Sequence, residues 1–206
     1  MKLLTTLITF AITAATSFAA DEEKDFKHLL NGKDTTGWHL RKDKGHNAWK
    51  VEEGILKNEL KKGEHGTDLV CDTKHSNFTV RYEFQVPDGS NSGFYLRGRH
   101  EIQILGDFKS GKASKVGNGG IYNLKEPSEF ASKPAGEWQT VEATIIDNKI
   151  TVTLNGKKIH DNVECNAGTG GQLDNNVKEP GPILLQGDHG TVWFRNIRVK
   201  ELPATK

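Results

Sequence analysis

Apolar and polar residues alternate along short runs of this chain, and clusters of Gly, Asn and Asp separate the runs. The clearest run is Phe78–Val86, in which every second residue is aromatic or Val, and Pro87-Asp88-Gly89 ends it. This two-residue period is typical of a half-buried strand, because successive side chains of a strand point to opposite faces. No sustained helical stripe of apolar residues is visible beyond residue 19. The pattern therefore predicts an all-β protein.

A tight hairpin is expected at Asn155-Gly156, because a two-residue turn of this type needs positive φ angles. Many strands in one domain indicate a sandwich, a jelly roll or a barrel of antiparallel sheet. Two long strand-free stretches, Gly106–Gly120 and Asn166–Pro182, are candidate functional loops. The other strands are expected at Trp49–Val51, Ile55–Leu60, Gly93–Arg99, Glu101–Leu105, Gly120–Asn123, Val141–Ile145, Ile150–Leu154, Ile183–Leu185 and Val192–Val199.

Residues 1–19 are expected to be a cleavable signal peptide. Lys2 supplies a positive start, Leu3–Ala15 forms an apolar core, and Ser17-Phe18-Ala19 offers small residues where signal peptidase reads. The apolar run is too short to span a bilayer, and the acidic residues after it are not typical of a stop-transfer flank. We therefore expect residues 20–206 to form one secreted or periplasmic domain without a membrane anchor.

The mature chain is expected to carry no net charge. Only Lys2 of the 28 Lys and Arg residues lies in the predicted signal peptide, which leaves 27 basic residues against 27 acidic ones. The lysines are scattered, so nucleic acid is not an expected partner. Cys71 and Cys165 could form one disulfide in an exported chain or stay free, and the sequence leaves both open.

Side chains suited to binding a sugar follow two neighbouring predicted strands. Strand parity places Tyr95, Arg97 and Arg99 on one face of the first strand, and Glu101 and Gln103 on one face of the second. Sugar hydroxyls need such donors and acceptors, and sugar rings pack against aromatic faces. These residues could instead form a solvated outer sheet face with an Arg–Glu pair.

A second candidate stretch follows the strand Ile183–Leu185 and carries Gln186, Asp188 and His189. A histidine changes its charge near neutral pH, so His189 is a candidate for proton transfer with Asp188 as its neighbour. It could also be an ordinary histidine of a surface turn. Tyr122 could place its hydroxyl in the same cleft or pack in the core.

Several common catalytic designs find no support in the sequence. The chain has no glycine-rich phosphate loop, no HExxH, no CxxC and no GxSxG motif. A jelly-roll glycosidase with paired carboxylates would need a second acid two or four residues after Glu101, where the chain has Gln103 and Leu105. A paired-acid mechanism is therefore not expected on this strand.

The order and spacing of several motifs resemble the 3-keto-disaccharide hydrolase domain family, which has a concanavalin A-like jelly-roll fold of the lectin/glucanase kind. The resemblance runs from about Phe26 to Leu202. One departure is Gly106, which stands before Asp107 where the family usually has an acid directly after the strand. The motifs are Leu30-Asn31-Gly32-Lys33-Asp34 with Gly37-Trp38, Trp49–Leu56, Asn91-Ser92-Gly93 with Arg97, Glu101–Leu105, Lys133–Trp138, Leu154-Asn155-Gly156, Gly181–Gln186 with His189-Gly190, and Phe194–Ile197.

The resemblance implies cleavage of glycosides that carry a ketone at C3, with an oligosaccharide or glycoside as the substrate. One base would remove the acidified C2 proton, a cation would stabilise the enolate, and the C1 substituent would leave. Either His189 or Glu101 is then the expected base or acid, and Arg97 is the expected enolate stabiliser. The expected substrate-binding residues are Gln103, Tyr122, Gln186, Tyr95, Arg99 and Asn91.

A divalent metal could take the place of Arg97, with Glu101, Gln103 and His189 as its ligands, although no ligand spacing identifies one. The same fold also serves non-catalytic carbohydrate-binding modules and interaction domains of secreted complexes, so both stay open as alternatives. The sequence determines neither the sugar nor the oligomeric state.

Overall fold

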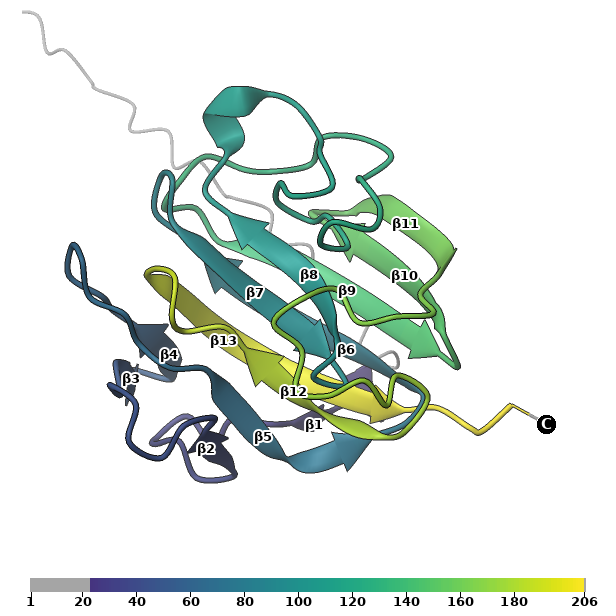
Figure 1. Cartoon of the computed structure of the whole chain (residues 1–206), viewed down its shortest axis with the longest axis horizontal. Helices are drawn as coiled ribbons and strands as arrows, with labels where there is room; N and C mark the ends of the chain where they lie inside the picture. Colours follow the sequence, from purple (N-terminus) through teal and green to yellow (C-terminus); the bar gives the residue numbers. More distant parts are fainter. Residues whose placement is uncertain (1–22, 206) are drawn as a thin grey trace, which may run out of the picture.

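The computed structural model describes residues 23–205, which form two antiparallel β-sheets packed face to face (Figure 1). The prediction of an all-β jelly-roll sandwich is confirmed. The predicted signal peptide, residues 1–19, lies outside the described residues. Among residues 23–205 there is no helix with the length and hydrophobicity that a membrane crossing requires.

The larger sheet has eight strands and forms the back layer in Figure 1. Its order is β11-β10-β9-β6-β13-β4-β3, and β1 pairs with β13. The strands are β1 (Lys27–His28), β3 (Trp49–Glu52), β4 (Ile55–Asn58), β6 (Phe78–Gln85), β9 (Gln139–Ile146), β10 (Lys149–Leu154), β11 (Lys157–Glu164) and β13 (Val192–Glu201).

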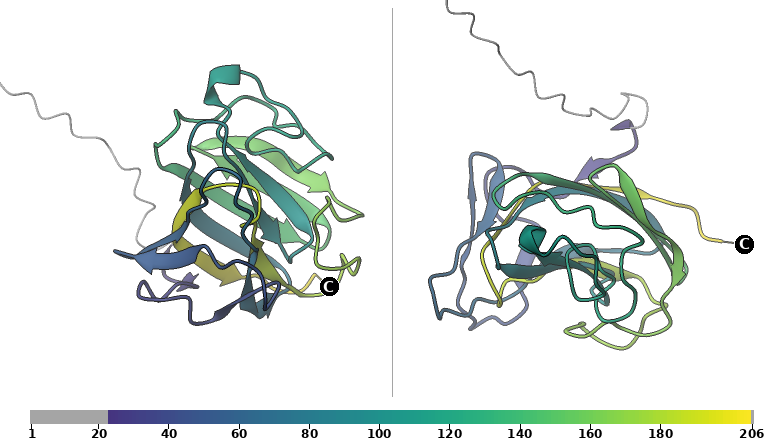
Figure 2. Two further views of the ribbon diagram at one scale, coloured as in Figure 1. Left: turned by 60° about the vertical axis from the view of Figure 1, so that its left-hand side comes forward. Right: turned by 90° about the horizontal axis from the view of Figure 1, so that it is seen from above.

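The smaller sheet has the order β2-β5-β12-β7-β8. The segment between β11 and β12 lies on the side of this sheet that faces away from the larger one (Figure 2). The loop after β8 contains a short 3-10 helix, η1 (Phe108–Ser110). The strands are β2 (Trp38–Leu40), β5 (Leu69–His75), β7 (Asn91–Leu96), β8 (His100–Leu105) and β12 (Gly181–Leu185).

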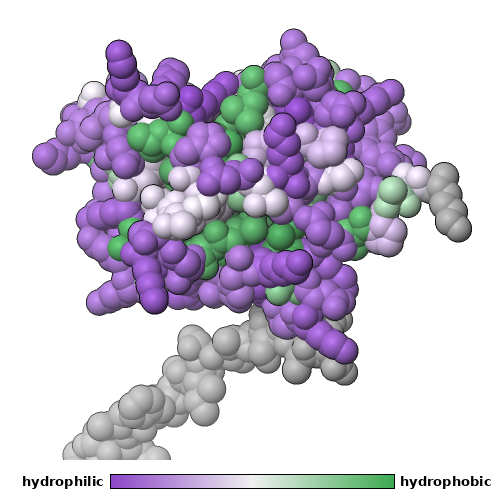
Figure 3. Space-filling model, turned by 90° about the horizontal axis from the view of Figure 1, so that it is seen from below, coloured by the Kyte–Doolittle hydropathy of each residue, from purple (hydrophilic) through white to green (hydrophobic). Residues whose placement is uncertain are grey.

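The hydrophobic core fills the space between the two sheets. Tyr82 of β6 and Phe94 of β7 stack across it with ring centroids 3.9 Å apart, and Phe194 of β13 lies 6.3 Å from each. Cys71 and Cys165 are both buried and both free, so the possible disulfide is not formed. The outer surface seen in Figure 3 is mainly hydrophilic with small apolar patches, which is ordinary for a chain in water.

The expected hairpin at Asn155-Gly156 is confirmed, since φ is 51° and 81° at these residues, which join β10 to β11. The expected strand at Gly120–Asn123 is wrong. Only Ile121 makes isolated bridges there, and Asn123 has a φ of 56° because the chain turns.

The expected strand Gly93–Arg99 is too long at its C-terminal end. Strand β7 stops at Leu96, and Arg97 and Gly98 form the turn into β8 with φ angles of 52° and 66°. Strand parity therefore does not apply to Arg97 and Arg99.

Replacing Phe94 with Ala should lower the free energy of unfolding by about 3–5 kcal/mol, because the change removes a fully buried ring from the centre of the core. Chemical denaturation followed by circular dichroism measures this. As the control, Phe108 is 41% exposed, and Phe108→Ala should change the stability by about 0.5 kcal/mol or less. Equal losses for the two variants would contradict the described core.

Candidate active site

Residues that pair across neighbouring strands point to the same face of a sheet and form rows across it. On the smaller sheet one such row consists of His39, Val70, Leu184, Tyr95 and Glu101, in that order from β2 to β8. These side chains point away from the main core, in which their strand neighbours lie. The row therefore ends with a tyrosine beside a glutamate on the outer face.

The next row on the same face is more polar. Gly93 pairs with Gln103, and Gln186 donates its backbone N–H to Gly93 at 2.9 Å. Farther along, the backbone N–H of Arg41 donates to the carbonyl of Asp68 at 2.9 Å. Glutamine and charged side chains from four segments thus meet next to the Tyr95–Glu101 pair.

The carboxyl group of Glu101 occupies space that exists because residue 93 is glycine. A Cβ atom on Gly93 would stand 2.2 Å from Oε1 of Glu101. Glu101 is only 3% exposed, and the Tyr95 hydroxyl forms a hydrogen bond with its carboxyl group. Any larger residue at position 93 would displace this carboxyl group.

Burial raises the pKa of Glu101 to about 7, and this desolvation is the largest cause. The hydrogen bond with Tyr95 and the charge of His189 lower its pKa, whereas the negative charges of Asp68 and Asp188 raise it. We call these five residues the Glu101 cluster. A carboxyl group with a pKa near neutrality can either accept or release a proton at physiological pH.

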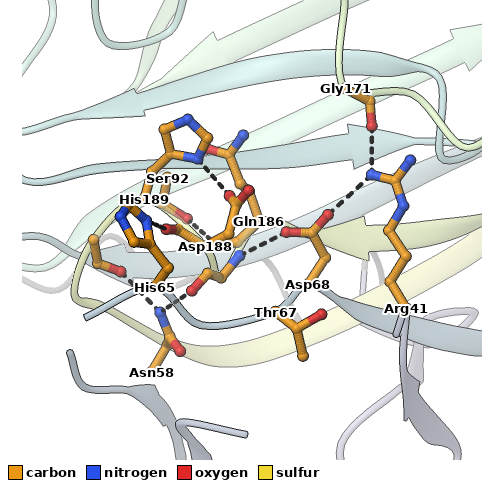
Figure 4. Close-up of polar contacts among 12 residues, drawn as sticks. Arg41, Asn58, His65, Thr67, Asp68, Ser92, Gly171, Gln186, Asp188 and His189 are labelled. Carbon is orange, nitrogen blue, oxygen red and sulfur yellow. Dashed lines mark hydrogen bonds and ion pairs between the residues drawn. The ribbon is translucent and has the colours of Figure 1, made fainter. Parts of the chain in front are cut away.

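The loop between β12 and β13 brings His189 and Asp188 to this cluster (Figure 4). Nδ1 of His189 is hydrogen-bonded to Oδ1 of Asp188, and the two side chains are 50% and 43% exposed. Asp68 holds the start of the loop, because its Oδ1 accepts the backbone N–H of Gly187 at 3.0 Å. Of the three groups expected to converge, His189 thus lies near enough for its charge to act on Glu101, and Asp188 is its hydrogen-bond partner.

Three side-chain amide oxygens on this face have no hydrogen-bond partner among the described residues. They belong to Asn91, Gln103 and Gln186, and all three atoms are buried. The amide nitrogen of Gln103 donates to the carbonyl of Val116 at 3.3 Å. A buried acceptor without a partner costs about 1–3 kcal/mol, so a ligand hydroxyl that reached these oxygens would gain that amount.

Tyr122 borders the same region rather than the core. It is partly buried, its backbone N–H donates to the carbonyl of Glu101 at 3.0 Å, and a Cβ on Gly170 would lie 3.9 Å from its ring. Asp107 has another role, because its carboxylate accepts hydrogen bonds from the Asn118 backbone and the Ser132 hydroxyl within the loop after β8.

The expected position of Arg97 is wrong. Its side chain is 1% exposed and donates to the Ser76 carbonyl, the Asp147 carbonyl and Oδ1 of Asn77 at 2.7, 2.7 and 3.1 Å. These acceptors belong to turns at one end of the sandwich, and Arg97 is absent from the charges that act on Glu101. The turn at residues 97 and 98 redirects the side chain, so Arg97 does not converge with Glu101 and His189.

Arg99 is absent from the charges that act on Glu101, and its expected role in substrate binding stays a prediction. Its guanidinium group binds both carboxylate oxygens of Asp174, at 2.6 and 3.0 Å, and the carbonyl of Glu179 at 2.8 Å. Arg99 therefore fastens the segment between β11 and β12 to the sheet.

Sequence reasoning missed Asp68, Arg41 and the structural need for Gly93. Asp68 directly precedes β5, a strand that the alternation rule did not predict because Leu69, Val70 and Cys71 are all buried. The apolar Leu69-Val70-Cys71 run after a Gly and a Thr was the available signal.

Among residues 23–205, no three His, Cys, Asp or Glu side chains lie close enough together to hold a metal ion. The metal ligands suggested from the sequence stay a prediction.

The raised pKa of Glu101 predicts a pH-dependent effect of Glu101→Gln on stability. The folded protein binds this proton more tightly than the unfolded chain, so wild-type stability should fall as the pH rises from 4.5 to about 7 and level off above that. The variant lacks this titration. Its free energy of unfolding relative to wild type should therefore increase across that window, by on the order of 3 kcal/mol. Denaturation curves at several pH values measure it, and a difference independent of pH would contradict the buried carboxyl group.

The chain is similar to known proteins over most of its length. Residues 25–200 match the family model of the 3-keto-alpha-glucoside-1,2-lyase-like domain. A 3-keto-disaccharide hydrolase of Bacteroides thetaiotaomicron is 29% identical over an alignment that covers 84% of this chain and 77% of that protein. A crystal structure of a candidate glycosyl hydrolase from Parabacteroides distasonis has a TM-score of 0.67 at 27% identity and covers 86% of this chain and 84% of that one. A second from the same organism has a TM-score of 0.73 at 21% identity and covers 91% and 99%. The chain belongs to the family of 3-keto-alpha-glucoside-1,2-lyase-like domains.

Proposed function

We propose that this protein cleaves 3-keto-glycosides, including 3-keto-disaccharides, by removing the C2 proton and expelling the substituent at C1, with Glu101 as the base. The observation that carries this proposal is a buried carboxyl group with a pKa of about 7 beside three unpaired amide oxygens. The family and the Bacteroides relative support the substrate class. The predicted signal peptide supports action in the periplasm or outside the cell.

The reaction needs one base and one acid. A ketone at C3 acidifies the hydrogen on C2, and Glu101 takes this hydrogen as a proton. The bonding electrons form an enolate between C2 and C3. When the carbonyl re-forms, the electrons move into a C1–C2 double bond, and the C1–O bond breaks. Addition of water to C1 of the resulting enone would complete a net hydrolysis.

Glu101 has the pKa that this task requires. An ordinary glutamate is a weak base at neutral pH, and desolvation strengthens it without removing it from its ionised state above pH 7. The hydrogen bond with the Tyr95 hydroxyl stabilises the ionised form of the carboxyl group and so lowers its pKa. A carboxyl group that titrates near neutrality is suited to proton transfer, which favours the enzyme over the carbohydrate-binding module.

His189 is the proposed acid for the departing oxygen. Its imidazole is oriented by Asp188 and is half exposed, so it can reach a leaving group that extends toward solvent. The positive charge of a protonated His189 also lowers the pKa of Glu101, so the proposed acid favours the ionised form of the proposed base.

The side-chain amides of Asn91, Gln103 and Gln186 are the proposed substrate-binding groups. With Arg97 committed to the turns, the amide nitrogens of Asn91 and Gln186 are the candidate donors to the C3 oxygen. A donor that is well placed for a developing oxyanion lowers the activation free energy by about 3–4 kcal/mol. Tyr122, which is partly buried, offers a ring face at the border of the same region, whereas Tyr95 is covered and acts through its hydrogen bond with Glu101.

Glu101→Gln should lower kcat with a 3-keto-glucoside by about 100- to 10,000-fold, because the amide cannot accept the C2 proton. Release of a chromogenic aglycone measures this rate. As the matched control, Glu129 pairs with Lys157 at the surface, so Glu129→Gln should keep full activity. Full activity of Glu101→Gln would remove the proposed base, and binding without turnover by the wild type would favour the carbohydrate-binding module.

A further inference from the structure

Arg41 and Leu173 lie next to the Glu101 cluster, and neither is needed for the chemistry proposed above. We propose that these two residues latch the segment Gly170–Leu173 against Tyr95, and that this latch keeps water away from Glu101. They are positioning residues, which act on the substrate only through the base. This inference rests on the proposed role of Glu101.

Arg41 forms the polar half of the latch. Its NH1 donates to Oδ2 of Asp68 at 3.0 Å and to the carbonyl of Gly171 at 2.7 Å (Figure 4). Its NH2 donates to the carbonyl of Gln172 at 2.9 Å. One planar guanidinium thus joins a sheet residue to two successive carbonyls of the segment. A lysine ammonium is a single point charge and cannot reproduce this fork.

Leu173 forms the apolar half. It packs against Val70, Tyr95 and Leu184, which are the centre of the outer-face row that ends at Glu101. Its backbone N–H also donates to the carbonyl of Gly98 at 2.9 Å. These contacts are separate from those of Arg41, so each half of the latch can be weakened alone.

Between the two halves, the backbone of the segment lies against Tyr95, the hydrogen-bond partner of the base. A Cβ on Gly171, where φ is 61°, would stand 2.7 Å from the Tyr95 hydroxyl oxygen. Just before the segment, the Thr169 hydroxyl accepts the backbone N–H of Glu101 at 2.8 Å. Since desolvation is the largest cause of the raised pKa of Glu101, a loosened segment should admit water and lower that pKa.

The variants must leave the charges around Glu101 unchanged. The charged and titratable groups that act on it are Tyr95 from β7, Asp68 before β5, and Asp188 and His189 from the loop after β12. Removal of the Arg41 cation would leave the Asp68 charge without its partner and would raise the pKa of Glu101. Arg41→Lys keeps the charge, and Leu173→Ala is neutral.

The test is an NMR titration of the Glu101 side-chain carboxyl carbon in protein labelled with ¹³C-glutamate, with the signal assigned by its loss in Glu101→Gln. In Arg41→Lys and in Leu173→Ala the titration midpoint should fall by about one pH unit relative to wild type. As the control, Arg195 binds Glu83 at 2.7 Å on the larger sheet, so Arg195→Lys should leave the midpoint unchanged. Unchanged midpoints in both folded latch variants would overturn the proposal.

The pH profile of kcat/KM gives a second readout. If Glu101 is the base, the acidic limb of this profile should move to lower pH in both latch variants, by the same amount as the titration midpoint. The titration needs no turnover, so the two ideas fail separately. If the wild type is inactive but the latch variants shift the titration midpoint, the proposed function alone is contradicted. If the wild type is active but the variants move neither the midpoint nor the pH profile, the latch alone is contradicted.

Discussion

A carboxyl group that is withdrawn from water on the outer face of a β-sheet requires several other features of this protein. Glu101 fits only because its diagonal neighbour on β7 is Gly93, where any Cβ would meet the carboxyl oxygen. It stays directed by the hydrogen bond with Tyr95, and its neighbours Ile102 and Ile104 on the same strand are anchored in the core. The register of β7 and β8 and the packing of their inner faces against the core therefore determine where the carboxyl group of Glu101 lies on the outer face.

Two loops complete the site and are held in place by hydrogen bonds. Asp68 connects both loops of the site, because one carboxylate oxygen accepts from Gly187 beside the His189 loop and the other accepts from Arg41, which holds Gly171 and Gln172. Asn58 of β4 donates to the carbonyls of Gly187 and Gly190 and so fixes the same loop from the larger sheet. Residues that are far apart in the sequence thus share one network of hydrogen bonds.

The two-residue period predicted most of the sandwich because it reports which side of a strand is buried. It also placed Glu101, Gln103 and Tyr95 on one face. It could not predict β5, because a covered strand loses its alternation when loops bury its outer side. Parity also failed at Arg97, since a turn with positive φ at a non-glycine residue leaves no clear mark in the sequence.

The residues that tune the site were the hardest to predict. Asp68 and Arg41 act through backbone groups of distant loops, and such contacts carry no local sequence pattern. Gln186 and His189 were placed beside the site because they follow a buried strand directly. Position relative to a strand end is thus readable from the sequence, whereas the partners that fix a loop depend on the completed fold.

The central claim is that Glu101 removes the C2 proton of a 3-keto-glycoside. The most direct measurement is the turnover of a 3-keto-glucoside carrying deuterium at C2, compared with its unlabelled form. We expect a primary isotope effect on kcat/KM and the loss of the C2 deuterium to water, and in Glu101→Gln the turnover and the deuterium loss should fall together. Cleavage without an isotope effect and with the deuterium retained at C2 would contradict it.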